Sequence, residues 1–266
     1  MSSITFVVPV GDKEVYEKCF SSSPLFKDSD DFQIIPQHGF SSSGEAFNDA
    51  IEKAVNDIIV FVHQDVVFPA AWAQEFLAEL QHLESSCSTV GVIGCLGMIT
   101  RTGQPAGHIY RHDREVFHPL RPAEVETLDE MVICFRKSSG LRFDTALPSF
   151  FYYAVDICLQ ANARGLKNFA VDAPCFHQAT YRKVFRKVFY ESQKYMLSKW
   201  KARLPVKTPS GVLDEEKFNI IQFIKRYIYL IIGYSPPPWW EKYPVINPDD
   251  ILYTKTGLTE QRTSGK

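Results

Sequence analysis

A histidine and a carboxylate close a strongly apolar stretch of this sequence. Ile58 to Val62 are apolar, and His63, Gln64 and Asp65 follow them directly. If the chain stays extended, the side chains of His63 and Asp65 point to the same side, because side chains in a strand repeat every second residue. Such a pair can bind a divalent metal ion. The alternative is structural, since a lone histidine is often a packed core group and an aspartate often forms a turn.

Two further candidate groups stand at the ends of other predicted elements. Asp156 follows the aromatic run Phe150 to Tyr153, where its structural role would be a favourable charge at a helix N-terminus. His177 ends the last predicted strand and could be a packed imidazole. Ligand sites of open α/β sheets lie beyond the carboxyl ends of the strands. These groups and the pair at 63 and 65 could therefore converge on one metal ion and one general base.

The elements that must position these groups alternate between strands and helices. Apolar runs bounded by turn residues predict strands, and apolar residues spaced by three and four predict helices. The expected strands are Ile4–Val10, Phe32–Ile35, Ile58–Val62, Val90–Met98, Met131–Phe135 and Phe169–Val171, and the expected helices are Ala46–Val55, Trp72–Leu83 and Ile157–Arg164. The alternation predicts an α/β domain with a mixed, mostly parallel sheet and helices on both faces.

One polar segment interrupts this pattern. It runs from Thr100 to Glu126, contains His108, His112 and His118, and is interpreted as a long loop. Its histidines could help to hold an acceptor, although solvated loop histidines are the simpler interpretation.

Length and composition indicate a globular protein. The chain has 266 residues, of which 45% are hydrophobic and 23% charged. We expect one domain at 1–178 and a helical C-terminal extension at 179–266 that packs on or near the acceptor side. The 6 cysteines form no Cys-x-x-Cys pair, which argues against a zinc ribbon or a disulfide framework. With no signal peptide and no apolar window long enough to span a bilayer, a cytoplasmic location is expected.

Positive charge is concentrated after residue 178. Nine Lys or Arg lie between Gln178 and Lys207 against a single Glu, while the whole chain has a net charge of −2. The pattern predicts a basic amphipathic helix from about Tyr181 to Trp200 and a second helix from Asp214 to Ile232. The basic helix could attract an anionic donor, lie on the inner face of an anionic membrane as a peripheral contact, or be solvated. Its aromatic residues would also suit single-stranded nucleic acid, but no other feature supports that partner, and we expect none.

The ordered set of motifs resembles the family 2 glycosyltransferases of GT-A fold. The matching segments, between residues 4 and 178, are TFVVPV, SSSGEAFNDAIEKAVNDIIVFVHQDVVFPAAW, VGVIGCLG, LDEMVICFRKSSGLRFD, FFYYAVDICLQANARG and VDAPCFHQ. More narrowly, the sequence looks like the branch whose metal motif reads His-Gln-Asp. The resemblance implies an inverting transfer of a sugar from a nucleotide-diphosphate donor to the hydroxyl of a glycan or other acceptor. It also implies a role in making a surface polysaccharide or glycoconjugate.

The resemblance assigns roles to individual residues. Mn²⁺ or Mg²⁺ would be bound by Asp65 and His177, with His63 beside them, and would bridge the diphosphate of the donor. Asp156 would be the general base that deprotonates the acceptor hydroxyl. The residues that would bind the donor are Pro9, Asn48, Gln64, Asp65 and Asp129.

Departures from the family pattern keep other functions open. His63 and Val155 stand where relatives carry acids, and no aspartate follows the second predicted strand to contact the nucleobase. The chain could therefore be a catalytically silent GT-A domain that binds a nucleotide sugar or a glycan. It could also be a sugar nucleotidyltransferase, which would release pyrophosphate instead of a nucleoside diphosphate.

Overall fold

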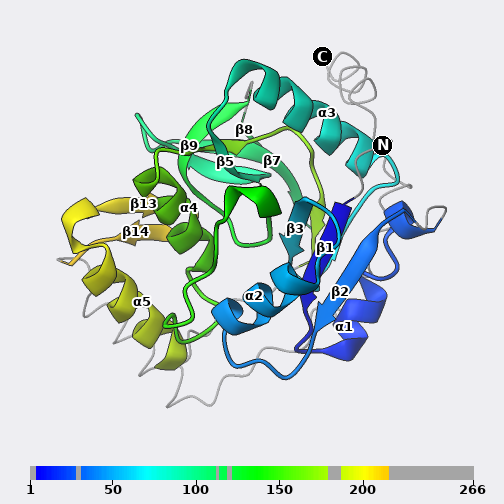
Figure 1. The fold of residues 1–266 in the computed structure, drawn as a ribbon, viewed down its shortest axis with the longest axis horizontal. Coiled ribbons are helices and arrows are strands. Elements are labelled where there is room, and N and C mark those ends of the chain that lie inside the picture. The colour runs from blue at the N-terminus through cyan, green and yellow to red at the C-terminus, as the bar shows by residue number, and fades with distance from the viewer. Residues whose placement is uncertain (1–3, 28–30, 112–113, 119–121, 179–186, 216–266) are drawn as a thin grey trace.

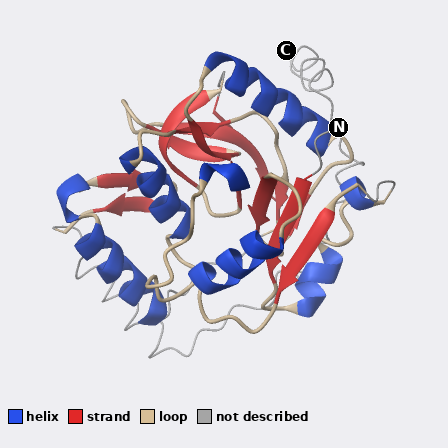
Figure 2. Ribbon diagram, viewed as in Figure 1, coloured by secondary structure: helices blue, strands red, loops and turns tan. Residues whose placement is uncertain are grey.

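The computed structural model describes residues 4–27, 31–111, 114–118, 122–178 and 187–215. Figures 1 and 2 show a large curved sheet with helices packed around it and a small two-stranded sheet beside α5. The helices are α1 (Lys13–Lys18), α2 (Ser43–Lys53), α3 (Trp72–Ser86), α4 (Tyr153–Ala163) and α5 (Lys187–Lys199). The strands are β1 (Ile4–Pro9), β2 (Gln33–Gln37), β3 (Ile58–Val62), β4 (Val66–Val67), β5 (Val90–Gly94), β6 (Leu96–Ile99), β7 (Pro105–Arg111), β8 (Arg114–His118), β9 (Ala123–Leu128), β10 (Val132–Arg136), β11 (Lys167–Ala170), β12 (Phe176–His177), β13 (Val206–Thr208) and β14 (Gly211–Leu213).

The large sheet is mixed, as predicted, but it is not mostly parallel. Its strand order is β2-β1-β3-β10-β5-β11-β9-β6-β7-β12-β4, with β8 paired to β7. Among the described strands of this sheet, parallel pairing is confined to β1 with β2, β1 with β3, β5 with β11, and β7 with β12. Strand β10 lies between β3 and β5 and is antiparallel to both. Strands β3, β5 and β10 are far apart in the sequence, and apolar runs alone do not indicate in which direction such strands pair.

The prediction of a loop from Thr100 to Glu126 is wrong. Strands β7 and β8 pair as an antiparallel hairpin inside this segment, and β9 begins within it. The segment was predicted to be a loop because it is polar. Some of its polar side chains are nevertheless buried, in contact with a polar partner. The side chain of His108 is 3% exposed, and its ring nitrogens lie 2.8 Å from Asp172 Oδ1 and 2.9 Å from Glu115 Oε1. His118 ends β8, and His112 lies outside the described residues.

Both faces of the large sheet are covered by apolar clusters, as predicted. Alternate side chains of β3 point to opposite faces: Ile59 and Phe61 join a cluster with α2, α4 and α5, whereas Val60 joins another with α3. Helix α2 begins where the Ser42 side chain accepts a hydrogen bond from the Glu45 amide, which is a typical N-cap. Val90 to Met98, predicted as one strand, is divided at Cys95 into β5 and β6. The remaining predicted strands and helices of this half are confirmed within a few residues.

The segment after residue 178 is only partly helical. Helix α5 confirms the 187–199 part of the predicted basic helix, and residues 179–186 and most of the second predicted helix lie outside the described residues. The prediction of helices alone is wrong, because β13 and β14 form a hairpin (Figure 1). Met196, Leu197, Val206 and Leu213 belong to the same apolar cluster as α2 and α4. The described part of the extension therefore shares the core of the first domain.

One consequence of the helix lengths concerns membranes. Within the described ranges, no helix combines the length and the apolar character that crossing a bilayer requires.

Candidate metal and donor site

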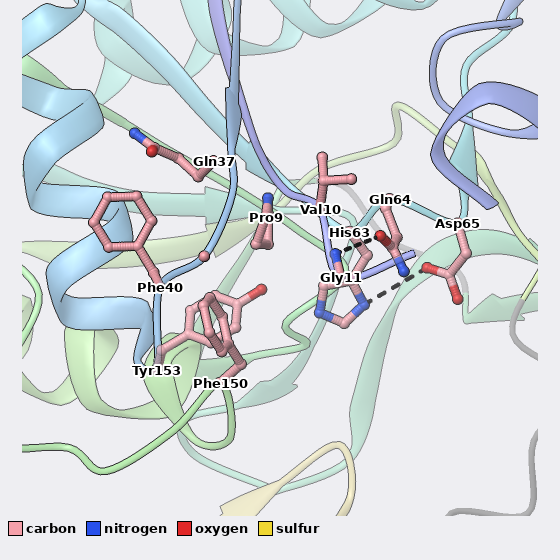
Figure 3. Close-up of a pocket in the computed structure, with 11 residues that line it drawn as sticks. Pro9, Val10, Gly11, Gln37, Phe40, His63, Gln64, Asp65, Phe150 and Tyr153 are labelled. Carbon is pink, nitrogen blue, oxygen red and sulfur yellow. Dashed lines mark hydrogen bonds and ion pairs between the residues drawn. The ribbon is translucent and has the colours of Figure 1, made fainter. Parts of the chain in front are cut away.

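A cavity of about 300 Å³ opens at the carboxyl ends of β1, β2 and β3 (Figure 3). Parallel strands end at the same edge of a sheet, so the loops that follow them converge there. The cavity is lined by Pro9, Val10 and Gly11 after β1, by Gln37, Gly39 and Phe40 at the end of β2, by His63, Gln64 and Asp65 after β3, and by Phe150 and Tyr153 near the start of α4. The prediction that chemistry gathers beyond these strand ends is thus consistent with the geometry.

The structure brings together the three residues predicted to bind a metal ion. His63, Asp65 and His177 each offer a ligand atom, and these atoms all lie within 4.8 Å of one another. Asp65 Oδ1 lies 3.4 Å from His177 Nε2 and 3.9 Å from His63 Nδ1. Strand β12 places His177 beside β4, and the Gln178 amide donates to the Asp65 carbonyl at 2.9 Å. Two distant segments of the chain therefore meet at one point.

The polar atoms of this triad fit a divalent cation. His177 is 8% exposed, and both of its ring nitrogens are buried without a hydrogen-bond partner in the described part of the chain. A buried polar atom without a partner costs roughly 1–3 kcal/mol, and such atoms in native proteins call for an explanation. Two imidazoles and a carboxylate form a ligand set that Mn²⁺ and similar ions accept. A bound ion would supply the missing partner.

The triad is electrostatically prepared for a cation. Burial alone raises the pKa of the Asp65 carboxyl, but the neighbouring imidazoles of His177, which has the larger effect, and of His63 outweigh burial and lower this pKa to about 2. The carboxylate is therefore ionised at neutral pH. An ionised carboxylate beside two imidazoles attracts a metal ion, and an oxyanion of a ligand can then complete the coordination shell.

Comparison with known protein families identifies the family of this chain. Residues 5–200 match the family described as "Glycosyltransferase like family". The chain belongs to this family. The match covers the whole cavity, the metal triad and α5, and it confirms the family resemblance stated from the motifs; the narrower His-Gln-Asp branch stays a prediction.

The individual proteins that are similar to this chain share little of its amino-acid sequence. A protein of Fuscovulum blasticum named "ATP synthase subunits region ORF 6" is 26% identical over 178 residues, which cover 63% of this chain and 68% of that one. The mannosyltransferase PcManGT from Pyrobaculum calidifontis, solved with GDP-Man and Mn²⁺, has a TM-score of 0.47 at 12% identity, with 85% of this chain and 70% of that chain covered. S. aureus TarS 1-349, solved with UDP-GlcNAc, has a TM-score of 0.48 at 13% identity, with 94% and 78% covered. With such TM-scores, these structures carry no part of the argument that follows.

In this glycosyltransferase-like protein Gln64 holds a loop. Its Oε1 accepts hydrogen bonds from the Gly11 amide at 2.9 Å and from the Asp12 amide at 3.0 Å. Asp12 in turn caps α1 through the Glu14 and Val15 amides. Gln64 therefore ties the turn that carries His63 and Asp65 to the loop after β1, and its oxygen is already occupied. Direct contact between Gln64 and a donor stays a prediction.

The other predicted donor residues are divided between the cavity and its surroundings. Pro9 lines the cavity, whereas Asn48 and Asp129 are not among its lining residues. The Asn48 amide donates to the Phe143 carbonyl and accepts from the Phe143 amide, so it fastens α2 to the neighbouring segment. The Asp129 side chain accepts a hydrogen bond from the Met131 amide, and the Met131 carbonyl accepts one from the backbone amide of His63. Asp129 thus supports the turn beside the metal triad, and donor contacts of Asn48 and Asp129 stay predictions.

The side chain of Asp156 is buried and paired, and its predicted role as general base stays a prediction. Its side chain is 2% exposed and lies 2.7 Å from Lys199 Nζ. Trp200 Nε1 donates to Asp156 Oδ1 at 2.8 Å, and Gln160 Nε2 donates to Oδ2 at 2.7 Å. A general base must touch the proton that it removes, and this carboxylate faces α5 with both oxygens occupied. Asp156 therefore fastens the C-terminal segment to α4, and Lys199 is used there instead of on the basic surface.

Sequence reasoning missed several cavity residues. Tyr153 is buried, its ring centroid lies 6.3 Å from that of His63, and its hydroxyl donates to the Glu130 carbonyl. Gln37 is also buried, and its amide donates to Asp49 Oδ2 at 2.9 Å. Gln37 stands directly at the end of β2, where the family pattern has its aspartate. The aromatic run before α4 and the polar end of β2 were the available signals.

Proposed function

We propose that this protein transfers a sugar from a nucleoside-diphosphate donor to a hydroxyl acceptor with the help of Mn²⁺ or Mg²⁺. One observation carries the proposal: His63, Asp65 and His177 meet beside a cavity of a glycosyltransferase-like chain, and both ring nitrogens of His177 are buried there without a good hydrogen bond in the described part of the chain. The ion would neutralise the charge that develops on the departing nucleoside diphosphate. The protein contributes the ligand set, the ionised carboxylate and the cavity.

The cavity suits the nucleoside half of such a donor. Its volume lies near the lower limit of ordinary ligand pockets, which matches a nucleoside better than a whole nucleotide sugar. Pro9, Val10 and Phe40 give it apolar walls, with Phe40 on the side opposite Asp65 (Figure 3), and such surfaces pack well against a planar base. With the diphosphate at the triad and the base between these walls, the sugar faces the side of Asp129 and Tyr153.

The proposed course is a single displacement with inversion at the anomeric carbon. Such a course needs one base and no covalent sugar–enzyme intermediate. Because Asp156 is buried and paired, a second candidate function keeps support, namely binding of a nucleotide sugar without transfer. Release of nucleoside diphosphate separates the two, because a binding protein protects the donor and a transferase consumes it.

A metal and donor titration tests the proposal. Thermal unfolding is measured with UDP-, GDP- and dTDP-sugars, with and without Mn²⁺, for the wild type, Asp65→Ala and His177→Ala. One donor should stabilise the wild type only when Mn²⁺ is present, by about 2.7 kcal/mol at a hundred times its dissociation constant. Both triad variants should lose this gain. His82→Ala is the matched control, because His82 is exposed on α3 and remote from the cavity lining.

Two results would contradict the proposal. If Mn²⁺ stabilises Asp65→Ala as much as the wild type, the triad is not the metal site. If no donor of the panel changes the unfolding temperature in Mn²⁺, the cavity does not bind nucleotide sugars of these classes. For a donor that does bind, nucleoside-diphosphate release measures transfer or hydrolysis, and the absence of release selects the binding function.

A further inference from the structure

His108 is a buried histidine that bridges two carboxylates outside the lining of the cavity. It lies on β7, and 3% of its side chain is exposed. Its Nδ1 lies 2.8 Å from Asp172 Oδ1, and its Nε2 lies 2.9 Å from Glu115 Oε1. Glu115 comes from β8, and Asp172 follows β11. One imidazole ring therefore joins three segments of the chain.

The two contacts of His108 require a proton on each ring nitrogen. An ionised carboxylate only accepts hydrogen bonds, and a neutral imidazole has one N–H group and one bare nitrogen. A bare nitrogen at either contact would face a carboxylate oxygen with its own lone pair. With both nitrogens protonated, both contacts become charge-assisted hydrogen bonds, and the buried positive charge is paired on both sides. The geometry therefore fits an imidazolium better than a neutral ring.

The backbone connects this ring to the metal triad. Asp172 begins a short segment that ends at His177. Within this segment the Cys175 carbonyl accepts a hydrogen bond from the Tyr110 amide at 2.9 Å, and β12 then pairs with β7 and β4. The contact with His108 thus fixes the beginning of the segment, and strand pairing fixes its end. A shift of Asp172 changes the path by which the chain reaches His177.

Aromatic rings make a second connection between His108 and the triad. The Tyr110 hydroxyl donates to Glu115 Oε1 at 3.2 Å, and His108 Nε2 contacts the same oxygen. The Tyr110 ring stacks on Phe176, with centroids 5.0 Å apart and planes inclined by 19°. Phe176 directly precedes His177 on β12. Glu115 is therefore linked through one pair of rings to the strand that carries His177.

We propose that His108 is a positioning residue for the metal site: as an imidazolium it holds Asp172 and Glu115, and these contacts place His177 for the ion. The inference rests on the proposed function, because it requires His177 to bind the metal. Polar partners beyond the ligands orient the ligands and typically change metal affinity tenfold or more, and because this connection is longer we expect about fivefold.

The first measurement detects the two protons directly. Nitrogen NMR of the metal-free full chain, with labelled histidine, distinguishes a protonated ring nitrogen from a bare one. The signals of His108 are those that His108→Gln removes. Both of its ring nitrogens should be protonated at neutral pH. A bare nitrogen at either position overturns the imidazolium and the proposal with it.

The second measurement is the affinity for Mn²⁺ alone, determined by calorimetry on folded protein. Glu115→Ala removes one contact of the ring and should weaken Mn²⁺ binding about fivefold. Glu115→Gln should bind like the wild type, because a glutamine oxygen can still accept from the charged ring and from Tyr110. His108→Gln should weaken binding at least as much as Glu115→Ala. His82→Gln, on the exposed face of α3, is the matched control and should change nothing.

The remaining outcomes separate this inference from the proposed function. Urea unfolding is measured on the same samples. If Glu115→Ala and His108→Gln unfold more easily but bind Mn²⁺ like the wild type, His108 only stabilises the fold and this inference fails alone. It also fails if Glu115→Gln binds as weakly as Glu115→Ala. If His108→Gln does not fold, the two Glu115 variants decide, because this side chain is 30% exposed. If the wild type itself binds no Mn²⁺, the proposed function fails, and the positioning role fails with it.

Discussion

Replacing Asp156 by asparagine should lower the stability of the protein and leave transfer by the folded molecules nearly unchanged. The prediction follows from the contacts of the carboxylate. Lys199 lies 2.7 Å from Oδ1, Trp200 donates to the same oxygen, and Gln160 donates to Oδ2. None of these contacts belongs to the cavity, and all of them join α4 to its own next turn or to the end of α5.

The size of the loss can be worked out from these partners. Breaking a buried ion pair by removing one charge costs about 3–5 kcal/mol. Lys199 is 24% exposed and keeps Asp144 at 2.5 Å, so part of this loss is recovered. An asparagine oxygen can still accept from Trp200, whereas an alanine cannot. We therefore expect a loss of about 2 kcal/mol for Asp156→Asn and about 4 kcal/mol for Asp156→Ala.

Urea unfolding at pH 7, measured together with donor turnover per folded molecule, decides whether Asp156 acts in stability or in catalysis. Asp144→Asn is the matched control, because it removes the other carboxylate of Lys199 and leaves Asp156 in place. Both single variants should shift the unfolding midpoint and keep turnover within a few-fold of the wild type. If Asp156→Asn unfolds like the wild type while turnover falls a hundredfold, Asp156 is the general base after all, and the structural argument is refuted.

Two further predictions concern the loop after β1 and the clamp on α5. Gln64→Leu removes the acceptor of the Gly11 and Asp12 amides, so donor binding should weaken about tenfold, equal to about 1.4 kcal/mol; calorimetry measures this, and an unchanged dissociation constant would show that the loop needs no such tie. Burial raises the pKa of Asp144, but hydrogen bonds from Lys199, Tyr195 and the Ala146 amide and the charge of Lys199 lower it overall. Because the folded pKa lies below the unfolded value of about 3.9, this carboxylate stabilises the fold above that pH and loses its contribution as the pH falls through the folded pKa. The urea midpoint should therefore drop less below about pH 4 in Asp144→Asn than in the wild type, and equal slopes would count against the clamp.

The group formed by His63, Asp65 and His177 could be predicted from the sequence because each residue follows a short apolar run. A five-residue apolar run ending in His63 and Asp65 defines a buried strand, its carboxyl end and the common side of two ligands. His177 was found because it also follows an apolar run. The structure added the distance between these groups, which depends on the pairing of β12 with β4. A two-residue strand leaves no periodic pattern, so that pairing could not be predicted.

The strands inside the polar segment illustrate the opposite case. His108 looks like a loop residue in the sequence, yet it is enclosed between Asp172 and Glu115. Asp172 comes from a distant part of the chain. A polar residue is compatible with a core when its partners arrive with another strand, and hydropathy along one segment contains no information about those partners.

Asp156 combines both situations, because its place on α4 could be predicted from the sequence and its contacts could not. A motif position fixes a residue on the first turn of α4, and in an open site that turn can present a carboxylate to an acceptor. What the carboxylate contacts depends on Lys199, which lies 43 residues later in the chain, and on Trp200 beside it. Lys199 was counted among the charges of the predicted basic helix, but in the structure Lys199 at the end of α5 and Trp200 directly after it contact the carboxylate. The C-terminal segment thereby packs against α4, while Phe150 and Tyr153, before and at the start of this helix, line the cavity.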